Sequence, residues 1–216
     1  MSMQGAMRAP SGRGLIMVIL AAAAALALWF IYTAAFHYIT YTQAAYGTLW
    51  PRRFALIPHI LGGVVAITTG LIQVWLGVTG RTRRLHIVLG RVYLGAVTVG
   101  SLAGFYLAST AGNGLAYGAG LFFLSTAWAL STAMAYIAVR RRAIEQHREW
   151  MLRSYVVTFA FVLFRVLDPW LEGHGIPPSE ATATTAWACW ALPLLALEPM
   201  LQYRKMRRRE SKLRPD

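Results

Sequence analysis

Hydrophobic residues along this chain are gathered into six long and nearly uninterrupted runs. The runs cover residues 14–36, 54–76, 87–109, 115–139, 151–171 and 183–203. A helix needs about 20 apolar residues, at a rise of about 1.5 Å each, to cross the hydrocarbon core of a bilayer. Backbone groups in hydrocarbon must be hydrogen-bonded within the segment, so runs of this length are expected to be helices. The pattern predicts an all-α fold, a polytopic bundle of six transmembrane helices.

The polar segments between the runs are short. Only residues 37–53 and 140–150 are long enough for more than a turn, so we expect one transmembrane domain over residues 14–203. Basic tails are expected at 1–13 and 204–216. The first run is longer than the roughly 7–15 apolar residues of a signal peptide, and no clean cleavage site follows it. We therefore interpret it as a membrane anchor.

The basic residues are distributed unevenly over the polar segments. The chain has 21 Lys and Arg residues against 8 Asp and Glu residues, a net charge of +13. Most of the basic residues lie in the two tails and in the loops after the second and fourth runs, whereas the other loops hold only Arg52 and Arg53. By the positive-inside rule, both termini are expected in the cytoplasm.

The same placement argues against nucleic acid as the partner of the basic residues. A high net positive charge often marks a nucleic-acid-binding protein. Here, however, the charges flank apolar runs, and the tail at 204–216 is expected to contact anionic lipid headgroups.

Composition excludes several other classes of protein. Hydrophobic residues make up 57% of the chain and charged residues only 13%, against roughly 25% charged residues in soluble domains. The single cysteine, Cys189, excludes a disulfide framework and a multi-cysteine metal site. The chain has no phosphate-binding loop, nucleophile elbow or His-Glu-x-x-His helix. These observations assign no class of enzyme.

Small residues recur at every fourth position in the second and third runs. Gly62, Ala66 and Gly70 form one such series, and Gly100 and Gly104 form another. Small residues at this spacing let transmembrane helices approach each other closely. We therefore expect the second and third runs to be packed tightly in the bundle.

Five ionisable residues within the runs stand out because such groups are costly in a membrane. They are His59, Arg91, Arg165, Asp168 and Glu198. Their positions along the runs predict two polar layers, an outer one and an inner one. The outer layer would pair Arg165 with Asp168 near His59, and the inner layer would pair Arg91 with Glu198. The simplest interpretation is structural neutralisation of buried charges, and the alternative is that Arg165 holds an anionic headgroup or a cofactor propionate.

Two histidines, His86 and His147, lie at the inner boundary on helices that run in the same direction. If these helices are neighbours, the two imidazoles can ligate one b-type haem iron. The arginines available for its propionates would be Arg83, Arg84, Arg91 and Arg153. Zinc is a poorer fit because no acidic or cysteine ligand accompanies the pair. The plain alternative is that both are helix-end residues.

His59 lies about 25 Å from His86 along the membrane normal, by helical rise, so the two cannot share an ion. An outer haem would use His59 with His174 or His37, and Arg165 as the propionate partner. Alternatively, His59 forms a hydrogen bond to Asp168 or to a backbone carbonyl.

Three segments carry a resemblance to a known family. They are HILGGVVAITTGLIQ, RRLHIVLGRVYL and EQHREWMLRSYVVTFAFVLFRVLDP. Over about residues 55–170 the chain resembles the bacterial predicted membrane proteins grouped as domain of unknown function (DUF) 2306. The most specific matching positions are His86, Gly90, Arg91, Tyr93, His147, Arg148, Trp150, Met151, Arg153 and Arg165. The resemblance implies an integral membrane protein of unassigned activity.

Three functional hypotheses follow from these features. The first is a membrane redox protein with haem b that takes electrons from a quinol or a soluble donor. The second is a small-solute transporter made of two inverted halves, although the two halves share no visible sequence pattern. The third is a non-catalytic membrane subunit or assembly factor.

Overall fold

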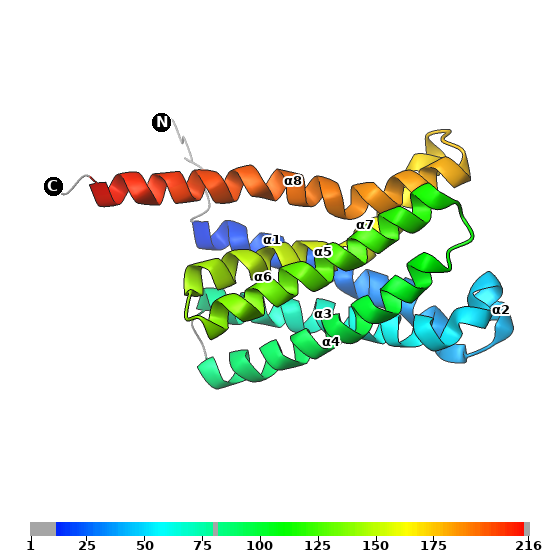
Figure 1. Ribbon diagram of the computed structural model, residues 1–216, viewed down its shortest axis with the longest axis horizontal. Helices are drawn as coiled ribbons and strands as arrows, with labels where there is room; N and C mark the ends of the chain where they lie inside the picture. The colour runs from blue at the N-terminus through cyan, green and yellow to red at the C-terminus, as the bar shows by residue number, and fades with distance from the viewer. Residues whose placement is uncertain (1–11, 80–81, 214–216) are drawn as a thin grey trace, which may run out of the picture.

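The computed structural model describes residues 12–79 and 82–213, and every regular element in these ranges is helical. Six helical passes alternate in direction along one bundle (Figure 1). The long helices are α1 (Gly12–Phe30), α3 (Arg53–Thr79), α4 (Arg83–Ser109), α5 (Leu115–Arg140), α6 (Ile144–Thr158), α7 (Ala160–Gly173) and α8 (Pro178–Leu213). The short helix α2 (Gln43–Tyr46) follows a π-helical segment at Ile31–Ala35 and a 3₁₀-helix at Phe36–Thr40, and it precedes a second 3₁₀-helix at Gly47–Arg52. The predicted all-α helical bundle is confirmed.

Five segments are long and apolar enough to cross a membrane. They are Gly14–Thr40, Gln43–Gly77, Arg83–Ser109, Leu115–Arg140 and Ile144–Gly173. The sixth predicted span, at 183–203, lies within α8, which has 36 residues and contains Pro193 and Pro199. Its length is sufficient, but α8 is not among the five apolar segments, so this span stays a prediction.

Helix α8 continues beyond the predicted end of the sixth span. Residues 204–213, expected to belong to a basic tail, are the last turns of this helix. The rest of the predicted tails, at 1–11 and 214–216, lies outside the described residues.

Because the passes alternate in direction, successive connections lie at alternate ends of the bundle. One end contains the beginnings of α1 and α4, the α5–α6 turn and the end of α8 (Figure 1). We call it the basic end, because the predicted Arg-rich segments flank these positions. The other end, here the opposite end, contains α2, the α4–α5 turn and the α7–α8 turn. The charge asymmetry of the sequence is thus an asymmetry of the folded bundle.

The core lies where α3, α4, α5 and α6 meet. Its central side chains are Ala66, Tyr93, Val97, Trp128 and Val157, all buried. A Cβ atom on Gly62 of α3 would lie 2.7 Å from the carbonyl oxygen of Ala96 and 3.0 Å from Cα of Gly100, both on α4. The predicted close approach of these two helices is confirmed, and it depends on glycine at this crossing.

The fifth apolar run is divided into two helices. Phe159 separates α6 from α7, and it accepts backbone hydrogen bonds from both Val162 and Leu163 at this break. The Thr158 hydroxyl donates to the carbonyl of Ser154, four residues earlier, at 2.9 Å. Such side-chain bonds to the preceding turn often bend helices. The break therefore lies directly after a polar side chain in the middle of the bundle.

Candidate functional site

Helices α4 and α6 run parallel, and a hydrogen bond at their centre sets their register. The Tyr93 hydroxyl lies 2.7 Å from Oγ of Ser154, 61 residues later in the chain. His86 and His147 are also 61 residues apart, and each lies seven residues before one member of that pair. Seven residues are two turns and about 10.5 Å of rise, so each histidine lies on nearly the same helix face as its partner. The register thus places the two histidines at the same depth toward the basic end, one on α4 and one on α6.

The ring of His147 is held in a defined orientation. Its Nδ1 donates a hydrogen bond to the carbonyl of Ala135 on α5, at 2.9 Å. A proton on Nδ1 leaves the lone pair of Nε2 available as an acceptor or a ligand. Histidines that ligate metals commonly donate their other ring nitrogen in this way.

His86 is fixed through its backbone by a glutamine that the sequence did not single out. Nε2 of Gln73, on α3, donates to the carbonyl of His86 at 2.6 Å. Gln73 is buried, and its Oε1 atom has no hydrogen-bond partner. Gln73 is thus a third polar residue beside the histidine pair.

The arginines expected near the pair take different positions. Arg83 precedes His86 by three residues, so it lies close to the same face of α4, and it is exposed. Arg91 is exposed on the outer surface of α4 beside Val88 and Val92. The predicted pair between Arg91 and Glu198 is wrong, because α4 presents Arg91 to the surroundings of the bundle.

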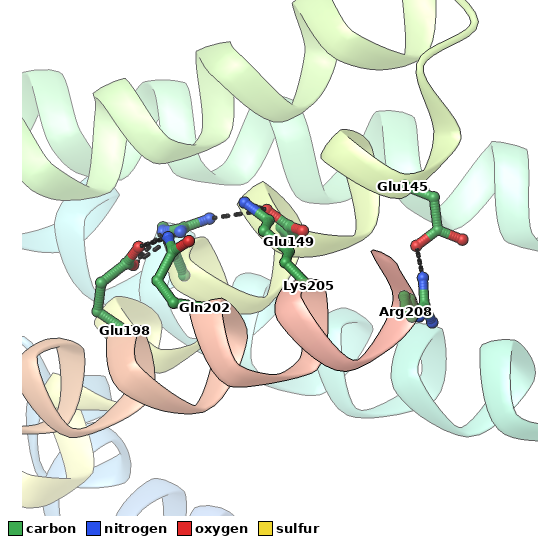
Figure 2. A network of polar contacts seen from close by, with 7 residues as sticks. Glu145, Glu149, Glu198, Gln202, Lys205 and Arg208 are labelled. Carbon is green, nitrogen blue, oxygen red and sulfur yellow. Dashed lines mark hydrogen bonds and ion pairs between the residues drawn. The ribbon is translucent and has the colours of Figure 1, made fainter. Parts of the chain in front are cut away.

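Glu198 instead pairs with Arg153, and this pair belongs to a network that joins α6 to α8 (Figure 2). Oε2 of Glu198 lies 2.7 Å from Nη2 of Arg153, and Oε1 accepts from Gln202 at 2.6 Å. Glu149 on α6 lies 2.7 Å from Nζ of Lys205 and 3.8 Å from Arg153. Arg153 is therefore engaged by two carboxylates and is not available for a cofactor propionate. Farther toward the basic end, Arg208 pairs with Glu145.

A buried cluster of hydroxyl groups, which the sequence analysis missed, lies farther from the basic end than the two histidines. The Tyr93 hydroxyl contacts Ser154 at 2.7 Å and Thr158 at 2.8 Å. Thr158 accepts from Nε1 of Trp128 at 2.8 Å, and Thr132 contacts Ser154 at 2.6 Å. We call these five residues the hydroxyl cluster. Ser154 and Thr158 lie four residues apart on one helix face, which was the available sequence signal.

His59 forms a hydrogen bond between α3 and α4, and it is not part of a second pair of histidines. Its Nδ1 donates to the carbonyl of Gly100 at 2.8 Å, and its ring lies 5.0 Å from that of Phe161. His37 and His174 lie in the segments at the opposite end, where each bonds to a local carbonyl. Within the described ranges, no second imidazole is paired with His59. The predicted outer haem therefore lacks its second ligand.

The outer polar layer also differs from its prediction. Arg165 is exposed, and no ion pair joins it to Asp168 in the described part of the chain. The Oδ1 atom of Asp168 is buried and has no hydrogen-bond partner.

The described residues contain no group of three or more His, Cys, Asp or Glu side chains placed to hold a metal ion. His86 on α4 and His147 on α6 share one depth in the bundle and remain a candidate pair. A b-type haem with two axial imidazoles needs no third protein ligand.

Comparison with known proteins identifies one family. A family model described as "Predicted membrane protein (DUF2306)" matches residues 56–201. Neither a curated protein nor a solved structure matches the chain.

Proposed function

We propose that this chain, which belongs to the DUF2306 family of predicted membrane proteins, binds one b-type haem between His86 and His147 and transfers electrons in the membrane. The observation that carries the proposal is the shared register of α4 and α6. The hydrogen bond between Tyr93 and Ser154 fixes that register, and the same 61-residue offset gives the two histidines a common depth in the bundle.

The surroundings of the pair support this assignment. The bond from His147 Nδ1 to Ala135 directs the free Nε2 lone pair away from α5. Exposed Arg83, one turn before His86, is the residue that would pair with a propionate. When bound, haem would supply one-electron transfer, and the chain's part would be to orient both imidazoles and to exclude competing ligands.

A single haem in this position lies near the basic end of the bundle. Because no second imidazole in the described ranges is paired with His59, the proposal contains no second haem at the opposite end. Electrons would therefore enter and leave within reach of one face of the membrane. A quinol or a soluble donor fits this arrangement, with a partner protein as the acceptor.

Reduced-minus-oxidised absorbance spectra of chain produced with added haem test the proposal directly. The wild type should show an α-band with about one haem per chain. His86→Ala and His147→Ala should each abolish the band or convert it to a high-spin spectrum. His174→Ala is the matched control, because His174 is exposed in the α7–α8 turn, and it should leave the spectrum unchanged.

Size-exclusion profiles of all variants separate loss of ligation from loss of folding. A wild-type chain that stays colourless with haem in excess would refute the proposal. It would be refuted equally if both alanine variants were folded and kept the wild-type band.

We also propose that the protein lies in a bacterial inner membrane with its basic end in the cytoplasm. The support is that the Arg-rich segments flank one end of the bundle. Exposed Arg204 and Arg207, in the last turns of α8, would then lie beside anionic lipid headgroups.

A further inference from the structure

Arg91 is a charged side chain on the outward face of a helix that is long and apolar enough to cross the membrane. It lies eight residues, or about 12 Å of rise, after the beginning of α4 at Arg83. The 27 residues of α4 are about 40 Å long, against about 30 Å for the hydrocarbon core of a bilayer. When the helix is centred in the bilayer, the Cα atom of Arg91 lies about 7 Å inside the hydrocarbon. A charge at this depth is costly unless an opposite charge meets it.

The helices around Arg91 contain no carboxylate that could be this opposite charge. Helix α4 and the two helices packed against it, α3 and α5, have no Asp or Glu in their sequences. The ion pairs in the described part of the chain lie within α6 or join α6 to α8, and none of them includes Arg91. The compensating charge must therefore come from outside the chain.

Arg84 lies on the same outward face of α4 as Arg91. The two residues are seven positions, or two turns, apart, and both are exposed. Side chains on a helix lean toward its N-terminus, and the N-terminus of α4 is at the basic end (Figure 1). The Arg91 side chain is thus directed toward the depth of Arg84, which lies at the level of the headgroups. Long arginine side chains reach the membrane interface in this way.

The same face of α4 is apolar and open below the two arginines. Val88 lies between them, and Gly95 and Leu102 continue the face deeper into the membrane, all exposed. A Cβ atom on Gly95 would have nothing within 4 Å, so an apolar chain can lie directly against the helix backbone there. Two cations above an apolar surface complement a phosphate above an acyl chain.

A second copy of this chain fits this face poorly. A two-fold axis along the membrane normal would bring the Arg91 side chains of the two copies together at one depth, where like charges repel each other. A partner helix would have to bring a carboxylate into the hydrocarbon, whereas a lipid phosphate already lies at the headgroup level. Helix α4 has no acidic residue in its first turn, and its N-terminus adds partial positive charge at that level. A lipid with a net negative charge is therefore favoured over a zwitterionic one.

We propose that the outward face of α4 binds one anionic phospholipid, whose phosphate is held by Arg84 and Arg91 and whose acyl chain lies along Gly95. Hydrogen bonds from arginine to phosphate are charge-assisted and often bidentate, which makes them stronger than bonds between neutral groups. The site is independent of the haem proposal, in which Arg83 is the partner of a propionate.

Native mass spectrometry of the full chain in detergent tests the site, with phosphatidylglycerol and phosphatidylcholine of the same acyl chains as probes. The wild type should bind phosphatidylglycerol more tightly. Arg91→Gln should weaken that binding about tenfold, as expected for the loss of a hydrogen bond between charged groups, and Arg84→Gln should also weaken it. Arg91→Lys keeps the charge and should retain most of the affinity. Arg140→Gln is the matched control, because it removes the same charge from an exposed arginine at the basic end of α5, and it should leave the affinity unchanged.

Glycerol 3-phosphate has a phosphate group but no acyl chain, so it should not displace the bound lipid. Displacement by this probe would indicate a site for soluble phosphates and would overturn the proposal. Equal affinity of the wild type for the two lipids would also overturn it. So would folded Arg91→Gln and Arg84→Gln that bind phosphatidylglycerol as tightly as Arg140→Gln, the result expected if Arg91 meets the carboxylate of a partner helix. Size-exclusion profiles identify any variant that does not fold, and the wild-type comparison then decides.

Discussion

The Tyr93 hydroxyl joins three helices at the centre of the bundle. It bonds to Ser154 and Thr158 of α6, and Thr158 in turn accepts from Trp128 of α5. Hydroxyl groups in a membrane interior stabilise helix association because no water competes for them. The same bond sets the register that gives the two histidines a common depth, so it serves the candidate site as well as the core.

Tyr93→Phe should therefore destabilise the protein, since Ser154 and Thr158 lose a shared partner. We expect a loss of about 1 kcal/mol, measured by denaturant-induced unfolding in detergent. Tyr106→Phe on the same helix is the control, because Tyr106 is exposed, and it should be neutral within about 0.5 kcal/mol. If Tyr93→Phe and Tyr106→Phe were equally stable, the Tyr93 hydroxyl would contribute nothing to the stability of the fold.

At the scale of the elements, α3 and α4 cross with their backbones in close contact. Gly62 lies against the backbone of Ala96 and Gly100, and Gly100 in turn lies under the ring of Trp128. Backbone atoms cannot move aside as a flexible side chain can. A methyl group at this crossing must therefore separate the two helices.

Gly62→Ala should lower stability by about 1–3 kcal/mol, the usual cost of overpacking a core. Gly95→Ala on α4 is the matched control, because a Cβ there would have nothing within 4 Å. That variant should be neutral or stabilising by up to about 1 kcal/mol, since alanine favours a helix more than glycine does. Melting curves in the same detergent compare the two, and a Gly62→Ala protein as stable as Gly95→Ala would contradict the observed packing.

The pairing of α6 with α8 is the second interaction between elements that matters for the site. Arg153 lies between Glu149 and Glu198 and also packs over the ring of Trp150, 4.7 Å from its centroid. The side chain of Glu198 is 45% exposed, so solvent screens part of its attraction to Arg153. The network positions α8 along α6 more than it adds stability.

At the scale of the whole molecule, the separation of charge predicts the orientation. Six alternating passes bring the start of α1 and the end of α8 to the same end of the bundle (Figure 1). That end is flanked by the Arg-rich segments, which favour the cytoplasm. Both ends of the described chain should therefore face the cytoplasm.

Reporter fusions in a bacterial host check this orientation. A fluorescent protein fused after residue 216 should be bright, and alkaline phosphatase at the same position should be inactive. Phosphatase inserted after Asn113, in the α4–α5 turn at the opposite end, should be active. The reverse pattern at both positions would mean that the basic end lies outside, and active phosphatase at both would exclude the three spans expected after Asn113.

Much of the fold could be predicted from the sequence because the determining signals are local. The length of an apolar run predicts a helix, and a glycine every fourth residue predicts close packing, as Gly62 confirms. The common depth of His86 and His147 also followed from the directions of their helices. The sequence also predicted that the Arg-rich segments lie on one side of the membrane, and they flank one end of the bundle.

Which side chains meet was decided by the tertiary structure. Membrane helices are apolar on all sides, so the sequence carries little signal for how each helix is rotated. The rotation of the helices places Arg91 on the outer surface of the bundle and pairs Glu198 with Arg153. It also directs His59 toward a carbonyl of α4. Depth is a property of one segment and can be read from it, whereas a partner depends on the rotation and neighbours of two helices at once.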